Sequence, residues 1–364
     1  MAGAGTIGDV AALPDVERCR AFWAREEVDR PLLATRVGSY GAASLYPRGL
    51  AHLPEGELKP ADIHFELFRK DYEALFERHL RASSDVPWSA FSLLVMPWLE
   101  AIAGCRVVHR SGNIWAEPRL DSYDRLEESL RPRLDWLAKL AEFTEWLVEL
   151  SDGRFPVAVS LLRGPADVLA AMRGAQDSVL DLMDAPQDPA RVLNWVTDLW
   201  VEAAQAQLSL IPPFAGGYGW NTQNLWSEEP GGWFQDDAIA YWSPSLYRRY
   251  AAPCEAKLSK SLPRTGCHLH SSAIFVVDGL LEMPDLGVIE MNLDDVGKSI
   301  PEMIPVFQKV LETQRLYVWG NFTRDDLVLM KETLPAKGLA LQLMYETPEE
   351  TRVMVQQVER IWLG

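Results

Sequence analysis

The chain has 364 residues, of which 48% are hydrophobic, so it can bury a large core, and its formal net charge is −17. This acidic balance excludes the basic face that nucleic acids and anionic membranes require, so neither is expected as a partner. The four cysteines are scattered without a CxxC motif, no run of 18 apolar residues occurs, and the start has no signal-peptide pattern, so we expect a reduced, cytoplasmic chain.

Short apolar runs alternate with amphipathic helical runs along the chain, which is the pattern of βα units and a parallel sheet. Eight such runs predict an α/β protein, a (β/α)8 TIM barrel, with residues 1–364 as a single domain. The predicted strands are 31–37, 88–96, 156–162, 216–220, 265–271, 287–293, 315–321 and 339–345.

The region 40–85 breaks this rhythm and is interpreted as a helical insertion. Within it, residues 60–83 predict one long helix between the first two strands. Residues 105–118, "CRVVHRSGNIWAEP", predict a β-hairpin with a Ser-Gly-Asn turn. Both features are expected as decorations of the barrel.

Fourteen tryptophans occur in the chain, and several fall in the glycine-rich segment 215–243. These aromatic side chains can pack the core, or they can line a pocket. On the second interpretation Tyr218, Trp220 and Trp242 are candidate substrate-binding residues, able to hold a methylated amine by cation–π contact.

Three helix starts carry clear signals in the second half of the chain. Ser243 precedes a proline at the first helical position. Thr323 is followed by acidic residues, and Thr347 by a proline and by Glu350 in a capping box.

Two of the six histidines, His268 and His270, lie two residues apart in "TGCHLHSS" (265–272). In a strand, residues i and i+2 point to the same face, and this strand end is expected at the mouth of the barrel, where active sites lie. The pair can therefore bind one divalent metal, zinc or another, although one histidine can equally be a core residue.

A metal site needs further ligands from other strand ends. Glu290 is the expected third ligand, and Asp236, Asp237 and Glu346 are further candidates. Glu290 and Asp236 are also the candidate catalytic carboxylates. As alternatives, Glu290 can be a rim residue paired with a basic side chain, and the two aspartates can cap the next segment.

Three more polar residues follow or lie in predicted strands and are candidate substrate contacts: Arg36, Arg163 and Asn321. An arginine can hold a carboxylate or phosphate with two parallel hydrogen bonds. Arg163 can equally be a surface charge, and Asn321 can cap its own βα turn.

The sequence resembles the uroporphyrinogen decarboxylase-like superfamily, in the branch that holds cobalamin-dependent methyltransferases. The resemblance is carried by the order of motifs along nearly the whole chain: "FWAREEVDRPLL" (22–33), "PWLEAIAGCRVVHRSGNIWAEP" (97–118), "VAVSLLRGPADVLAAMRG" (157–174), "QDDAIAYWSPSLYRRYAAPCEAKL" (235–258), "HLHSSAIFVVDGLLEMPDLGVIEMN" (268–292) and "VWGNFTRDDL" (318–327).

The resemblance implies a TIM barrel and, in the methyltransferase branch, a zinc ion held by a histidine-x-cysteine motif and a later cysteine. Here His268 matches the histidine, but His270 stands in place of the cysteine, and no cysteine follows Cys267. A harder site of nitrogen and oxygen ligands is then expected. The arginine-rich motif of the true decarboxylases is reduced to Arg36.

The expected function is therefore a metal-dependent methyltransferase that moves a methyl group between a small methylated compound and a corrinoid or similar carrier. A corrinoid, if used, is expected on a partner protein. The alternatives are a decarboxylase or lyase acting on a small carboxylic acid, and a non-catalytic small-molecule-binding barrel. Barrels of this kind often pair, and the sequence leaves a homodimer open.

Overall fold

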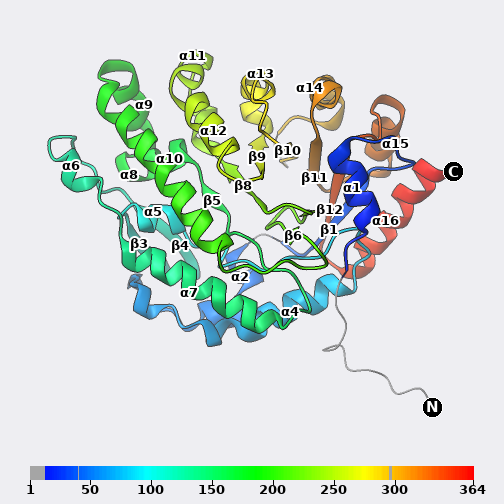
Figure 1. Ribbon diagram of the computed structural model, residues 1–364, viewed down its shortest axis with the longest axis horizontal. Helices are drawn as coiled ribbons and strands as arrows, with labels where there is room; N and C mark the ends of the chain where they lie inside the picture. Colours follow the sequence, from blue (N-terminus) through cyan, green and yellow to red (C-terminus); the bar gives the residue numbers. More distant parts are fainter. Residues whose placement is uncertain (1–12, 40, 295–296) are drawn as a thin grey trace.

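The structure is a computed structural model that describes residues 13–39, 41–294 and 297–364. Its centre is a parallel sheet of seven strands in the order β1-β12-β11-β10-β9-β8-β5. Figure 1 shows this sheet inside a fan of helices. The strands are β1 (Leu32–Val37), β5 (Leu162–Arg163), β8 (Gly231–Gln235), β9 (Arg264–His270), β10 (Val288–Asn292), β11 (Leu316–Gly320) and β12 (Leu339–Tyr345).

Six predicted strands coincide with or overlap strands of this sheet, and two do not. The predicted strand 88–96 contributes one isolated bridge, between Ala90 and Val157. The predicted strand 216–220 lies outside the sheet, because β6 (Tyr218–Gly219) pairs only with β7 (Trp226–Ser227). The strand of the sheet in this part of the chain is β8. The architecture described is therefore a TIM-barrel-like α/β fold with seven paired strands rather than eight.

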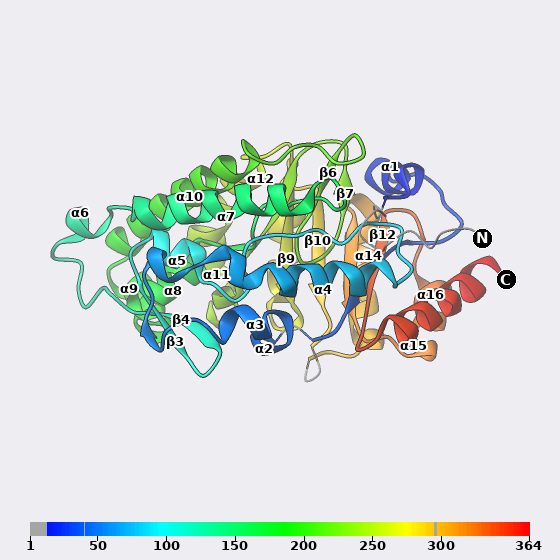
Figure 2. The ribbon, with the colours of Figure 1, turned by 90° about the horizontal axis from the view of Figure 1, so that it is seen from below.

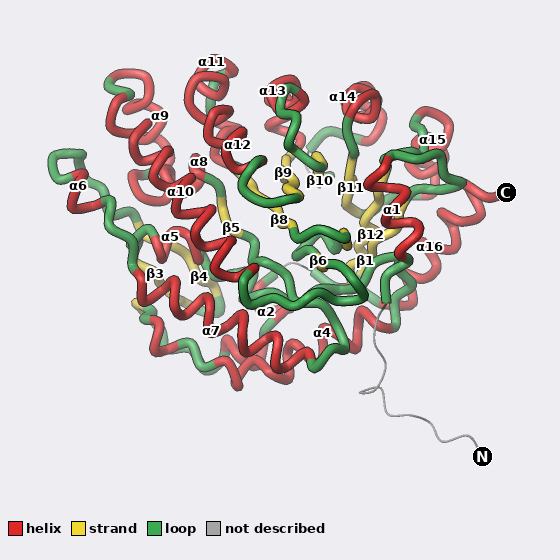
Figure 3. Tube along the Cα trace, in the orientation of Figure 1, coloured by secondary structure: helices red, strands yellow, loops and turns green. Residues whose placement is uncertain are grey.

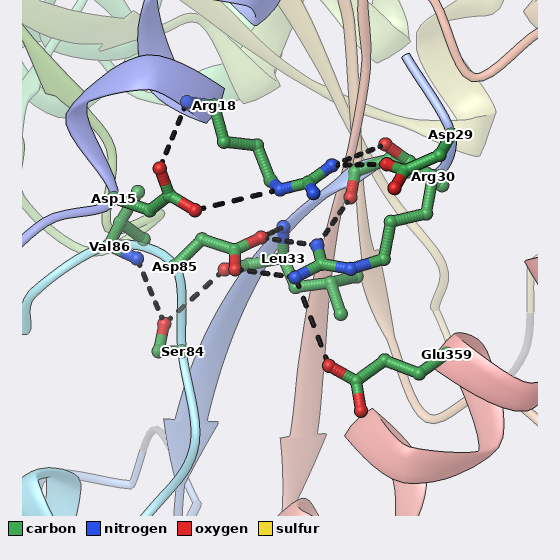
Figure 4. Close-up of polar contacts among 10 residues, drawn as sticks. Asp15, Arg18, Asp29, Arg30, Leu33, Ser84, Asp85, Val86 and Glu359 are labelled. Carbon is green, nitrogen blue, oxygen red and sulfur yellow. Dashed lines mark hydrogen bonds and ion pairs between the residues drawn. The ribbon is translucent and has the colours of Figure 1, made fainter. Parts of the chain in front are cut away.

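The segment that follows the insertion is fixed beside β1 by a buried ion pair. Both terminal nitrogens of Arg30 donate to the carboxylate of Asp85, at 2.6 and 2.8 Å. Asp85 also accepts a hydrogen bond from the backbone N–H of Leu33, and its own N–H donates to the Leu33 carbonyl. Figure 4 shows these contacts meeting at the start of β1. Side-chain bonds here replace part of a strand-to-strand ladder.

Helices cover the outside of the sheet, and the last three begin with capping boxes at Ser299, Thr323 and Thr347. Ser243 caps its helix as predicted, because its side chain accepts from Leu246 N–H. The helices are α1 (Val16–Ala24), α2 (Ala42–Leu45), α3 (Pro47–Leu50), α4 (Arg69–Leu80), α5 (Trp98–Ile102), α6 (Leu126–Ser129), α7 (Leu134–Ser151), α8 (Pro165–Arg173), α9 (Ala175–Asp184), α10 (Gln187–Leu208), α11 (Pro244–Leu246), α12 (Ala252–Ser259), α13 (Val277–Leu281), α14 (Ile300–Thr313), α15 (Arg324–Thr333) and α16 (Pro348–Leu363).

The inserted region 40–85 is less regular than predicted. Instead of one helix, residues 60–83 form two short 3-10 turns, Pro60–Asp62 and Phe65–Phe68, and then α4. The predicted hairpin is present as β3 (Arg106–Arg110) and β4 (Asn113–Glu117), with β2 (Gly56–Glu57) paired to β3. Its turn residues Ser111 and Gly112 both have positive φ, as a tight two-residue turn requires.

The two ends of the parallel strands are covered differently. Figure 2 shows α1 and the β6–β7 hairpin at one end, and α2, α3 and the β3–β4 hairpin at the opposite end. Aromatic rings fill the first end: Trp220 contacts Trp23 and Trp233, with ring centroids 5.4 and 5.1 Å apart. The second end, where the strands finish, is left for the polar site described below. Among the described residues, no helix combines the length and apolar character needed to cross a bilayer.

Candidate metal centre

The two histidines of β9 face two polar residues of β10. The parallel register pairs His268 with Glu290 and His270 with Asn292. Since side chains alternate along a strand, these four residues share one face of the sheet at its carboxyl edge. Asp237, the first residue of the 3-10 turn Asp237–Tyr241 that follows β8, joins them from the other side of β9.

Three possible ligand atoms converge at this point. His268 Nε2 lies 3.1 Å from His270 Nε2, and Asp237 Oδ1 lies 3.9 and 3.6 Å from these two nitrogens. The three residues form a group able to hold one metal ion. A tetrahedral ion with bonds of about 2.0–2.2 Å spaces its ligands roughly 3.3–3.6 Å apart, so the triangle fits one such ion.

Each imidazole has a carboxylate behind it, on the side away from this triangle. His268 Nδ1 contacts Glu290 Oε2, and His270 Nδ1 lies 2.8 Å from Asp294 Oδ1. Asn292 donates to the same Asp294 oxygen at 3.0 Å. When Nδ1–H is held in this way, the lone pair of Nε2 is left for a metal, as in many metalloproteins.

The electrostatic surroundings favour a cation at this position. Burial by itself lowers the pKa of His268, but the carboxylates of Glu290, Asp237 and Asp294 outweigh it and raise that pKa to about 9. Two neutral imidazoles cannot place their lone pairs 3.1 Å apart without repulsion, so the pair requires either a proton or a cation between its rings.

The site opens into a cavity of about 410 Å³. That volume is within the range of small-molecule pockets, which hold their ligands by an apolar wall and a few polar groups. The apolar lining is Leu94, Val95, Met96, Trp98, Ile114, Leu161 and Trp319, and the polar lining is Glu100, Asn113, Arg163, Thr222, Gln223, Gln235, Asp237, His268, His270 and Asn292.

Two of the predicted acidic residues occupy places other than those expected. Glu290 lies against His268 Nδ1 and is a positioning partner of that histidine rather than a member of the ligand triangle. Asp236 is buried and accepts hydrogen bonds from the N–H groups of Ala166 and Asp167, so it caps the start of α8. Its neighbour Asp237 faces the cavity instead.

Of the three predicted polar substrate contacts, the structure brings one to the cavity. Arg163 lines it, with a half-exposed side chain that donates to the buried carboxylate of Glu100 at 3.1 Å. Arg36 is buried in β1 and is absent from the cavity lining, and Asn321 is exposed outside it. Glu346, the other candidate ligand, is also exposed.

The tryptophans of segment 215–243 belong to the core and not to this cavity. Trp220 is fully buried against Trp23 and Trp233, and Trp242 is buried in the main core. Tyr218 packs against that core from β6. The segment reaches the cavity through polar residues instead, Thr222 and Gln223.

Several residues of the site were missed in the sequence. Asn292 and Asp294 follow the predicted Glu290 at spacing two, as His270 follows His268, so their shared strand face was a usable signal. Gln235 supports Asp237, donating from Nε2 to Oδ2 at 2.9 Å. Glu100 and Gln223 carried no signal, because neither lies at the end of a predicted strand.

Comparison with known proteins bears on the fold. No protein-family model and no curated protein sequence matches the chain. Among solved structures, it is similar to a methyltransferase from Methanosarcina mazei, with a TM-score of 0.64 and 15% sequence identity, over 96% of this chain and 100% of that chain. At this identity the likeness shows a shared fold.

Proposed function

We propose that the protein is a metal-dependent methyltransferase that acts on a small molecule held in the cavity beside Asp237, His268 and His270. The observation that carries this proposal is the convergence of three ligand atoms on one wall of that cavity, each supported from behind. The fold shared with the Methanosarcina mazei methyltransferase, together with the motif order of the sequence, favours methyl transfer.

The residues divide the work in a definite way. Glu290 and Asp294 hold the two rings so that both Nε2 atoms face the cavity, and Gln235 holds the carboxylate of Asp237. A divalent ion, when bound, supplies Lewis acidity to the reacting heteroatom. Trp319 and the apolar residues of the wall exclude water from the reacting groups.

The methyl carrier is proposed to be a corrinoid on a partner protein. The cavity is near the lower end of the size range of small-molecule pockets, so it suits the small reactant better than a corrinoid. A lyase acting on a small acid is less well supported, because two of its three expected contacts, Arg36 and Asn321, do not line the cavity.

Metal content of the purified chain is the first test. We expect about one equivalent of zinc or another divalent ion in the wild type, strongly reduced in Asp237→Asn and absent from His268→Ala/His270→Ala. His52→Ala, which replaces an exposed histidine, should keep its metal and serves as the control. Circular dichroism should show that the variants are folded. A metal-free wild type would contradict the metal part of the proposal.

Methyl transfer is tested separately with free methylcobalamin and a small thiol or amine. The wild type loaded with metal should demethylate the corrinoid, followed by its absorbance, and the double histidine variant should not. If the metal-loaded protein does not demethylate methylcobalamin, the metal site stands but the proposed methyl transfer is contradicted.

A further inference from the structure

Part of the cavity wall is formed by a loop and not by the strand ends that carry the two histidines. The β6–β7 hairpin carries a loop, residues 220–225, whose tip lines the cavity with Thr222 and Gln223. Figure 3 shows β6 and its loops beside β1, β8 and β12, at the centre of the fold. The loop therefore approaches the site from the end of the strands opposite to the mouth.

Hydrogen bonds to the inner side of the fold hold this tip in place. Gln342 of β12 donates to the carbonyl of Thr222 at 3.0 Å. Asn221 donates to the carbonyl of Val159, and Asn224 donates to the carbonyl of Thr35 in β1 at 3.0 Å. Thr222 itself has a φ of +33°, a conformation that threonine rarely adopts. Such strain persists only where the surroundings fix it, and it is common at functional sites.

The tip nevertheless leaves polar atoms without partners. Thr222 and Gln223 are 3% and 2% exposed, and neither Thr222 Oγ1 nor Gln223 Oε1 has a hydrogen-bond partner among the described residues. Another lining residue, Glu100, is fully buried: its Oε1 accepts from Arg163, and its Oε2 has no partner there. Buried unpaired acceptors are destabilising, and all three residues line the same cavity, so their unpaired oxygens point to a ligand there.

We propose that Thr222, Gln223 and Glu100 recognise a small molecule whose polar end carries N–H donors, as an amide or an amine does. This inference rests on the proposed function only in placing the substrate in the same cavity. The three unpartnered atoms are all oxygens able to accept hydrogen bonds. The hydrocarbon part of the molecule lies against the apolar wall, which includes Leu94, Ile114 and Leu161.

An anionic end is disfavoured by the same residues. Arg163 is the basic side chain among the described lining residues, apart from the two histidines, and it already donates to Glu100. A carboxylate placed beside Glu100 Oε2 would meet a like charge in a buried position. Amide and ammonium groups differ in charge but share the N–H donors that the three oxygens require.

Binding of three four-carbon probes of nearly equal size tests the inference: butyramide, butylamine and butyrate. Calorimetric titration of the full-length wild type should show millimolar or tighter binding of at least one nitrogen compound, at least about tenfold tighter than butyrate. Gln223→Leu should weaken that binding about tenfold or more. Glu100→Gln should weaken butylamine more than butyramide, which separates the two kinds of donor.

A melting curve distinguishes recognition from a structural role. Gln223→Leu removes an amide whose buried Oε1 has no partner among the described residues, so its melting temperature should equal or exceed that of the wild type. Gln207→Leu is the matched control, because the Gln207 amide accepts from Ser160 N–H and donates to the Ala203 carbonyl. That variant should melt several degrees lower.

Three results would overturn the inference: butyrate binding as tightly as the nitrogen compounds, no binding of either nitrogen compound, or unchanged binding by Gln223→Leu. The titrations are made on both metal-free and metal-loaded protein. If the chain never holds metal but binds a nitrogen compound through Gln223, this inference stands and the proposed function is wrong. If the chain binds metal but shows no preference for N–H donors, the proposed function stands and this inference is wrong.

Discussion

Two stretches of the strand order differ in the contacts that hold their segments together. One stretch, which we call the regular arc, consists of strands β8, β9, β10, β11, β12 and β1. Continuous parallel ladders join these strands. The other stretch, which we call the irregular arc, consists of segments 84–96 and 156–163. These segments are held by an isolated bridge, by the two-residue strand β5 and by side-chain hydrogen bonds such as those of Asp85. The regular arc carries the metal-ligand candidates, and the irregular arc carries Arg163 and part of the apolar wall, Leu94, Val95, Met96 and Leu161.

This difference shows what each kind of structure can position. A hydrogen-bonded strand ladder fixes side chains on neighbouring strands at a constant spacing. This suits His268 and Glu290, because the imidazole of one must contact the carboxylate of the other. An irregular segment leaves room for side chains to converge from several directions, which suits a binding wall. The experiments below test that division, beginning with the largest expected effect.

Removing the side-chain bonds of the irregular arc should be the most damaging change. Asp85→Ala removes both carboxylate hydrogen bonds of the buried Arg30 guanidinium, which keeps the Pro31 carbonyl at 3.0 Å and Glu359 at 3.9 Å, and it leaves the N–H of Leu33 without its acceptor. We therefore expect a loss of about 3 kcal/mol in the free energy of unfolding. Urea denaturation measures it. Asp29→Ala breaks an exposed ion pair with Arg18 and should cost less than about 1 kcal/mol. Similar losses in both would mean that Asp85 does not organise this arc.

A buried carboxyl behind the regular arc should make stability depend on pH. Burial raises the pKa of Glu255 to about 7, and Tyr247 O–H donates to its carboxylate at 2.8 Å. The folded chain then binds more protons than the unfolded chain between about pH 4.5 and 7. The protonated carboxyl therefore adds to the free energy of unfolding at low pH, and this stabilisation is lost as the pH rises to about 7. For this group, the loss in the free energy of unfolding should amount to roughly 3 kcal/mol.

Glu255→Gln should remove that dependence, since the amide stays neutral and can still accept from Tyr247. Its free energy of unfolding relative to the wild type should rise as the pH goes from 5 to 8, measured by chemical denaturation at each pH. A constant difference between the two proteins across this range would show that Glu255 is ionised in the folded chain.

The two carboxylates behind the histidines should differ in importance. Glu290→Gln replaces a fully buried charge and should weaken metal binding about 10–100-fold in competition with a chelator. Asp294→Asn should weaken it less, because Asp294 is partly exposed and solvent screens its charge. Equal effects would mean that burial does not decide the strength of this support.

The smallest effect is expected at the helix starts of the regular arc. Thr347 caps α16 by accepting from Glu350 N–H, so Thr347→Ala should cost about 1 kcal/mol. A serine at the same position should restore most of the loss, as followed by thermal denaturation. By contrast, α8 in the irregular arc has no side-chain cap of its own at Gly164 and depends on Asp236.

The sequence predicted the regular arc well and the irregular arc poorly. Strands β9 to β12 and the caps at Thr323 and Thr347 followed from periodicity and local signals, which act over a few residues. Strand β8 was missed because it begins with Gly231 and Gly232. A side chain at Gly231 would come within 2.3 Å of the Trp220 ring, so packing across the fold requires a glycine that looks like a turn in the sequence.

The candidate site was predicted in part for the same reason. The two histidines share a strand face, which alternation reveals, but adjacent Asp236 and Asp237 face opposite ways after β8 ends, and alternation does not choose between them. The tryptophans of segment 215–243 are core residues because the hairpin enters the fold, and entry of a loop is a long-range event that local pattern does not encode.

The inner hairpin has a consequence for how such a protein can diversify. Its tip, Thr222 and Gln223, and the metal-ligand candidates Asp237, His268 and His270 enter the same cavity from opposite ends of the strands and belong to separate segments of the chain. Exchanging residues 222 and 223 therefore changes what is recognised without touching His268, His270 or Asp237. Chemistry and selectivity are encoded as separate modules, which mutation can vary one at a time.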